Sequence, residues 1–189
     1  MKTQKKVTTL VMAFAMIIGT SIFSQTKERT VEVGGAPMYP SKNIVENAVN
    51  SKDHTTLVAA VKAVGLVETL QSEGPFTVFA PANSAFDKLP KGTVEFLVKP
   101  ENIKTLQTIL TYHVLAGKFS ASDIVSAIKA GNGKAEFKTV SGGKLYASLS
   151  GKDVVLIDEN GGKSKVTIKD VNQSNDVIHV VDAVVTPKS

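Results

Sequence analysis

The spacing of apolar residues changes along the chain from a helical period to a strand period. From Ser41 onward, apolar positions mostly recur every three or four residues, as in helices that bury one face. After Gly131-Asn132-Gly133 the chain reads as short apolar runs separated by glycine-containing turns, which is typical of strands. Helices therefore dominate the first half and strands the second. This segregation predicts an α+β fold and not an alternating, doubly wound one.

Local stop signals set the expected boundaries. Asp53 is expected to cap the second helix, and Gly65 to end it in the left-handed conformation. Pro81 must end the apolar strand before it, because proline cannot donate to a strand ladder. Asn83 or Ser84 is expected to cap the helical turn that follows. The predicted helices cover 41–49, 54–64, 66–72, 83–89, 92–97, 102–110 and 123–128, and the predicted strands cover 76–80, 136–139, 144–149, 153–157, 165–170 and 177–186.

The first 24 residues have the pattern of a secretory signal peptide. Three lysines precede an apolar run at 7–23 that contains no acidic residue and is followed by a polar segment. We predict a signal peptide at 1–24 with cleavage after Ser24; the alternative is an uncleaved anchor. Residues 25–40 are interpreted as an extended leader, and 41–187 as one domain.

The charge and the lack of cysteine narrow the function classes. Loss of residues 1–24 would lower the formal net charge from +5 to +2, and Arg29 is the only arginine. Dispersed lysines at near-neutral charge argue against nucleic acid and against anionic membrane as partners, and no membrane span is expected after signal cleavage. Without cysteine there are no disulfides, so apolar burial must hold an exported domain of this size together.

The sequence contains no local arrangement for catalysis. It has no Gly-x-Ser-x-Gly turn, and its three histidines are more than 50 residues apart without a metal-ligand partner at helical spacing. The oxygen-rich segment 158–162 suggests a calcium loop only faintly, because the closing glutamate is missing. We therefore expect no catalytic residue, metal or cofactor. An extracellular hydrolase, in which a folded cleft gathers a histidine, a carboxylate and a serine, is the remaining enzymatic alternative.

Several polar residues stand in apolar company. An unpaired imidazole costs about 1–3 kcal/mol when buried, so each buried histidine should find a hydrogen-bond partner. Tyr112 joins a ring that packs to a hydroxyl that can face water, which suits a rim contact as well as a core one. The residues interpreted as structural polar groups are His54, Asn83, His179 and Asp182.

Three separated segments together carry a family resemblance. They read Phe-Thr-Val-Phe-Ala-Pro-Ala-Asn-Ser-Ala-Phe at 76–86, Leu-Thr-Tyr-His-Val-Leu at 110–115, and Val-Ile-His-Val-Val-Asp-Ala-Val-Val at 177–185. In this order and spacing they resemble the fasciclin domain family, in its single-domain, secreted bacterial type, over about 42–187. The resemblance implies a β-rich wedge with several helices packed along one side.

The resemblance also implies a function. Members of the family are not enzymes and act in cell adhesion, so we expect an exported module that binds a cell-surface or matrix protein or a glycan. Its location would be secreted, periplasmic or at the cell surface, and its state a monomer or weak homo-oligomer. The alternative is a carrier of an apolar small molecule such as a carotenoid or lipid. The positions that match the family's contact motifs are Tyr112, His113, Asp170 and Val171.

One substitution follows from these expectations. If the Tyr112-His113 element has an exposed end, Tyr112→Ala should weaken partner binding more than it weakens folding.

Overall fold

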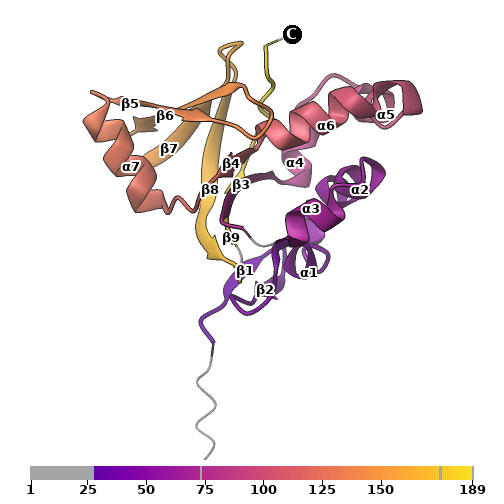
Figure 1. Ribbon diagram of the computed structural model, residues 1–189, viewed down its shortest axis with the longest axis horizontal. Helices are drawn as coiled ribbons and strands as arrows, with labels where there is room; N and C mark the ends of the chain where they lie inside the picture. The colour runs from indigo at the N-terminus through magenta and orange to yellow at the C-terminus, as the bar shows by residue number, and fades with distance from the viewer. Residues whose placement is uncertain (1–27, 73, 175, 189) are drawn as a thin grey trace, which may run out of the picture.

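The computed structural model describes residues 28–72, 74–174 and 176–188, so the predicted signal peptide lies outside the described residues. The helices pack around a seven-stranded sheet and a separate two-stranded hairpin (Figure 1). The strands are β1 Val31–Val33, β2 Ala36–Met38, β3 Phe76–Pro81, β4 Val114–Ala116, β5 Lys134–Lys138, β6 Lys144–Ser150, β7 Asp153–Ile157, β8 Lys163–Asn172 and β9 Asp176–Val181. The helices are α1 Ile44–Ala48, α2 Thr55–Ala63, α3 Val67–Gln71, α4 Asn83–Phe86, α5 Thr93–Leu97, α6 Ile103–Tyr112 and α7 Ala121–Ala130, with 3-10 turns at Lys52–His54 and Pro100–Asn102.

The strand order is β4-β3-β9-β8-β7-β6-β5. The central strands β3 and β9 run parallel, and every other neighbouring pair is antiparallel. All described side chains of β9, and all of β3 after Phe76, are buried, because both faces of this part of the sheet are covered. A strand covered on both faces reads as a continuous apolar run, which explains why these two segments stand out in the sequence.

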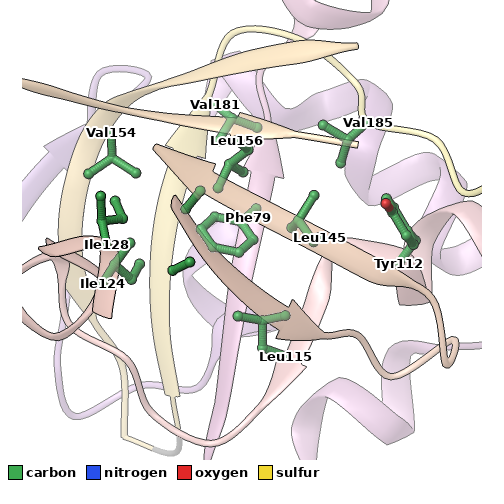
Figure 2. Packing of buried hydrophobic residues seen from close by; sticks show 12 residues of the cluster. Phe79, Tyr112, Leu115, Ile124, Ile128, Leu145, Val154, Leu156, Val181 and Val185 are labelled. Atoms are coloured by element: carbon green, nitrogen blue, oxygen red, sulfur yellow. The ribbon is translucent and has the colours of Figure 1, made fainter. Parts of the chain in front are cut away.

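The sheet curls until its two outer strands meet. The Val140 amide, just after β5, donates to the Val114 carbonyl of β4 over 2.8 Å, and Leu115 bridges Thr139. The inside of the curl holds the main apolar core, with Phe79 near its centre (Figure 2). The residues of this core are Phe79, Tyr112, Leu115, Ile124, Ile128, Ala135, Leu145, Ala147, Val154, Leu156, Val181 and Val185.

Helices α1 to α6 lie on one side of the sheet, while α7 lies apart from them and packs against β5 and β6 (Figure 1). A second apolar cluster fills the space between the outer face of β3 and β9 and the hairpin with α1. A third joins α2, α3 and α6. The molecule is thus an α+β wedge with most of its helices along one side, as the sequence predicted. None of the helices within the described ranges has the length and apolar character needed to cross a bilayer.

The expected extended leader contains a hairpin. Strands β1 and β2 pair through a Gly34-Gly35 turn in which both glycines have positive φ, +60° and +74°. Two successive residues with positive φ form the tight turn that matches the twist of a hairpin. Val33, Ala36 and Met38 are buried in the second cluster. The interpretation of residues 25–40 as an extended leader therefore needs correction at 31–38, where the glycine pair in the sequence marks the turn of a hairpin.

Two other expectations need correction. The helix predicted to end at 110 continues through Tyr112, since α6 extends its apolar face to that residue, and the short strand Val114–Ala116 that follows was not predicted. Strand β9 ends at Val181 instead of continuing to 186. The residues beyond it form an irregular tail that is held by side chains.

Asn83 caps a helix other than the predicted one. Its carboxamide oxygen accepts a hydrogen bond from the Thr56 amide, 3.1 Å away, and its nitrogen donates to the Lys52 carbonyl over 2.9 Å. Asn83 therefore satisfies the start of α2 from a segment 27 residues further along. Helix α4 has Ala82 at its N-cap position and no side-chain cap. Helix α2 has His54 at its N-cap position, so the predicted cap by Asp53 is wrong.

Candidate functional site

His113 ties the end of α6 to the C-terminal tail. Its Nδ1 atom donates to the Ile109 carbonyl over 2.8 Å, and its Nε2 atom accepts from the Val185 amide over 3.2 Å. The side chain is buried, and burial lowers the imidazole pKa to about 4. Both ring nitrogens are engaged, so His113 serves as an internal tie in its neutral form.

Tyr112 lies wholly within the main core (Figure 2). Its hydroxyl donates to the Lys144 carbonyl over 2.5 Å, and burial raises the phenol pKa to about 12. The ring packs on Gly143, where an added β-carbon would come within 2.7 Å of Cε2. The expectation of an exposed end for the Tyr112-His113 element is therefore wrong, because neither side chain reaches the surface.

Asp170 and His179 meet at an irregularity in β8. The pairing of β8 with β9 shifts register between Ile168 and Val171, and Asp170 adopts φ +57° there. The Asp170 amide donates to His179 Nδ1 over 3.3 Å, and its carboxylate accepts from the Ala121 amide at the start of α7 over 2.7 Å. A residue other than glycine at positive φ persists only where its surroundings hold it, and such positions gather at functional sites.

His179 itself is fully buried. Its Nε2 atom donates to the Phe119 carbonyl over 2.9 Å, and its ring stacks on Phe79 at 5.7 Å between centroids. Burial lowers its pKa. Val171, the other predicted contact residue on β8, is buried against the outer face of the sheet. Of the four predicted contact residues, the structure leaves only Asp170 partly exposed.

Asp182 and His54 serve other parts of the fold. The Asp182 carboxylate accepts from the Lys165 amide over 2.8 Å and pairs with the Lys88 ammonium at 3.1 Å. His54 Nδ1 lies 2.9 Å from the Ser51 hydroxyl. Its buried Nε2 atom has no partner in hydrogen-bond geometry within the described residues, although the nearby Ala80 carbonyl partly offsets the burial that lowers its pKa.

An open groove of about 350 Å³ lies beside Asp170. Its base is formed by the buried residues Ile124, Val154 and His179. Its rim carries the polar side chains of Ser122, Lys152, Asp153, Thr167 and Lys169. The volume falls in the range of about 300–1,000 Å³ that is typical of ligand sites. The groove therefore combines concavity, an apolar base and a charged rim at one place.

The groove does not contain a working hydrolase site. Ser122, His179 and Asp170 all line it, as the enzymatic alternative would require. However, both nitrogens of His179 are bonded to backbone groups, and the Asp170 carboxylate is held by the Ala121 amide. A general base needs a free nitrogen within reach of the nucleophile, and this imidazole has none.

The oxygen-rich segment 158–162 is used internally. Asp158 accepts from the amides of Asn160 and Gly162 with one carboxylate oxygen and from the Thr186 amide with the other. Its carboxylate thus holds a turn and the C-terminal tail. No group of three or more histidine, cysteine or acidic side chains suited to a metal ion occurs within 28–72, 74–174 and 176–188.

A second cavity of about 100 Å³ lies between the N-terminal layer, which is formed by the β1–β2 hairpin and helices α1 to α3, and the outer face of the sheet. Its wall is almost entirely apolar, with His54 and Ser51 among its few polar residues. The lining includes Met38, Ile44, Leu57, Val61, Ala80 and Val180.

The sequence analysis missed the lysines of the groove rim. Lys152 comes from the β6–β7 turn and stands in no motif, while Lys169 comes from β8 and directly precedes the matched Asp170-Val171 pair. Only the proximity of Asp170 to Lys169 could have pointed to this region. The meeting of β7, β8 and α7 depends on the tertiary fold and has no local signature.

Comparisons with known proteins agree on one family. The family model described as the fasciclin domain matches residues 52–187. Protein sll1483 of Synechocystis is 41% identical over 195 residues, which cover 99% of both chains. The cell surface glycolipoprotein MPB83 of Mycobacterium bovis is 30% identical, covering 96% of this chain and 78% of that protein. A solved fasciclin domain pair from the insect cell adhesion molecule fasciclin I superposes with a TM-score of 0.68 at 17% identity, covering 84% of this chain and 58% of that one.

Proposed function

Because the chain belongs to the fasciclin domain family, we propose that it is an exported, non-catalytic module for adhesion or surface binding. The single observation that carries this proposal is the open groove beside Asp170, which has a charged rim and an apolar base. The buried histidines and Asp158 are bonded within the fold, so recognition falls to the outer surface. The partner is a cell-surface or matrix protein or a glycan.

Export is supported by two observations. The predicted signal peptide has the charge and apolar pattern of secreted proteins. In addition, a relative that matches 96% of this chain is named a cell surface glycolipoprotein. We place the mature chain in the periplasm, at the cell surface or outside the cell.

The proposal is tested by retention of the mature chain on cells. Fluorescently labelled chain from residue 25 onward is expected to bind intact cells of the source organism saturably, and excess unlabelled chain should displace it. Flow cytometry measures the bound fraction, with the same chain after urea unfolding as the control. Retention that does not saturate, or that survives unfolding, would contradict a folded binding module.

A second function is supported by the apolar cavity under the hairpin. We propose, as the alternative, that the chain carries a small apolar molecule there, such as a carotenoid or a lipid chain. The cavity volume of about 100 Å³ is below the roughly 300–1,000 Å³ of ordinary ligand sites. A cargo of carotenoid or lipid length would therefore have to separate the N-terminal layer from the sheet.

Extraction of the protein from its native host tests the carrier function. Organic extracts of the purified chain should contain one apolar compound at a fixed molar ratio, detected by absorbance and mass spectrometry. The Ala80→Leu variant should retain less of it, because Ala80 lines the cavity and the added carbons would occupy the space. An extract without such a compound, or equal loading of the variant, would rule out carriage in this cavity.

A further inference from the structure

The sheet opens between β7 and β8 at the groove. The two strands pair only through Val155↔Lys165, Leu156↔Ser164 and Ile157↔Lys163. Beyond Lys165, β8 continues to Asn172 and pairs with β9 along its other edge. Among the described residues, no neighbouring strand therefore pairs with the edge that faces the groove at 166–169, while both backbone groups of Asp170 are bonded to His179 and Asn172. Backbone groups along a free strand edge are a template for pairing with another extended segment.

This edge is held in place from three directions. The Asp170 carboxylate binds the Ala121 amide of α7, and the Asp170 amide binds His179 on β9. At the other end, the Lys165 amide donates to the Asp182 carboxylate over 2.8 Å. An edge whose backbone is already ordered loses less conformational entropy when it pairs with a partner.

The charges around the edge are unequal. Asp153 is paired with the Lys165 ammonium at 2.7 Å, and the Asp170 carboxylate accepts from an amide. Lys152 and Lys169 are exposed on the rim and make no ion pair with any described residue. The exposed charge at the groove that has no ion pair among the described residues is thus positive, and it lies beside the partly buried carboxylate of Asp170. It favours an acidic partner and repels a second copy of the same lysine-bearing edge.

We propose that an extended, acidic segment of a partner protein docks in this groove as an added strand beside β8. Its backbone pairs with the edge at 166–169, alternate apolar side chains face Ile124 and Val154, and its carboxylates meet Lys152 and Lys169. This is peptide recognition by strand addition, in which the main chain provides affinity and the side chains provide selectivity. The inference rests on the proposed surface-binding function and names the partner chemistry of that site.

An acidic glycan fits this groove less well. The only ring in its lining is that of His179, which is fully buried. A sugar would therefore find no exposed aromatic face, and it would leave the free backbone edge unpaired. The unpaired backbone groups of this edge favour pairing with the main chain of a protein segment.

Fluorescence anisotropy with a short labelled peptide of alternating valine and glutamate tests the proposal on the mature chain. We expect saturable binding that weakens as salt is raised, since the lysine contacts are exposed. The combined variant Lys152→Glu and Lys169→Glu should bind at least about 10-fold more weakly, a loss of about 1.4 kcal/mol. The matched control Lys91→Glu removes an exposed lysine that does not line the groove and should bind as the unmodified chain does.

Two further probes separate the possible modes of binding. The same peptide methylated at alternate backbone amides should lose most of its affinity, because it can no longer donate along the strand edge. Acidic oligogalacturonate should not compete with it. Competition by the saccharide, equal binding of the methylated peptide, or full binding by the double lysine variant would overturn strand addition.

The cell-retention assay distinguishes failure of this inference from failure of the proposed function. If the peptide does not bind and the double lysine variant is still retained on cells, the groove is not the contact site, while the surface-binding function stands. If the unmodified chain is not retained either, both are wrong. If retention falls in the double variant and not in Lys91→Glu, the groove is supported as the contact site.

Discussion

Replacing Tyr112 with alanine is expected to lower the free energy of unfolding by about 4 kcal/mol, the size usual for a large aromatic side chain removed from a core. The ring is fully buried and packs on Gly143, so its loss opens a cavity that the surrounding strands cannot fill. It also removes the hydrogen bond from the hydroxyl to the Lys144 carbonyl. Urea unfolding followed by circular dichroism measures the change.

Tyr112→Phe is the matched control. It keeps the ring and removes only the hydroxyl, which donates to Lys144 and accepts from the Glu159 amide at 3.3 Å. A loss of about 1–2 kcal/mol is expected from the groups left unpaired. In conditions where the Tyr112→Ala variant is still folded, this variant should be retained on cells as well as the unmodified chain is. A large loss of retention with an unchanged urea midpoint would instead restore Tyr112 as a contact residue.

Acidification from pH 7.5 to 4 is expected to destabilise the fold markedly, with His113 the best-defined contributor. The pKa of His113 is about 4 in the folded chain, and the unperturbed value of 6.5 applies to the unfolded chain. Below pH 6.5 the unfolded chain therefore binds more protons than the folded chain. The stability that neutral His113 contributes is present above pH 6.5 and is lost as the pH falls toward 4. The difference between the two pKa values corresponds to about 3 kcal/mol. His54 and His179, whose pKa values burial also lowers, add to the loss in the same direction.

The contribution of His113 is separated by comparing pH slopes. His113→Gln lowers stability at neutral pH, since it disturbs the bonds to Ile109 and Val185, but it removes the titrating ring. The free energy of unfolding of this variant should therefore fall less between pH 7.5 and 4.5 than that of the unmodified chain. Equal falls in the two chains would show that His113 is not a source of the acid sensitivity.

Local patterns were sufficient to predict most of the elements. Strand β7 has the predicted bounds, because a short run rich in valine, leucine and isoleucine between two glycine-containing turns favours a strand. Gly65 takes positive φ, as expected of a residue that ends a helix. The strand from Phe76 includes Pro81 and so ends one residue later than predicted, since Pro81 still lies opposite Val181 of β9. The hairpin at 31–38 was missed because strands of three residues are too short to establish a period.

The environment of the side chains was harder to predict. Tyr112 suits a rim and a core equally well by its chemistry, and it is buried because the Lys144 carbonyl, 32 residues further on, comes within reach of its hydroxyl. Asn83 could cap the helix beside it, yet it caps one that begins 28 residues earlier. Each choice depends on a partner that is distant in sequence, so no window of neighbouring residues contains it.

The amino-acid order alone established the α+β class, the family and the apolar runs that become the central strands. The class and the apolar runs follow from periodicity and from stop residues, which act over a few neighbouring positions. The family follows from the resemblance carried by the three segments at 76–86, 110–115 and 177–185. The folded arrangement decided which polar groups are internal ties and where a partner can reach the surface. The groove exists because β8 leaves β7 after Lys165 while it keeps β9, and that parting is a property of strand register in the assembled sheet.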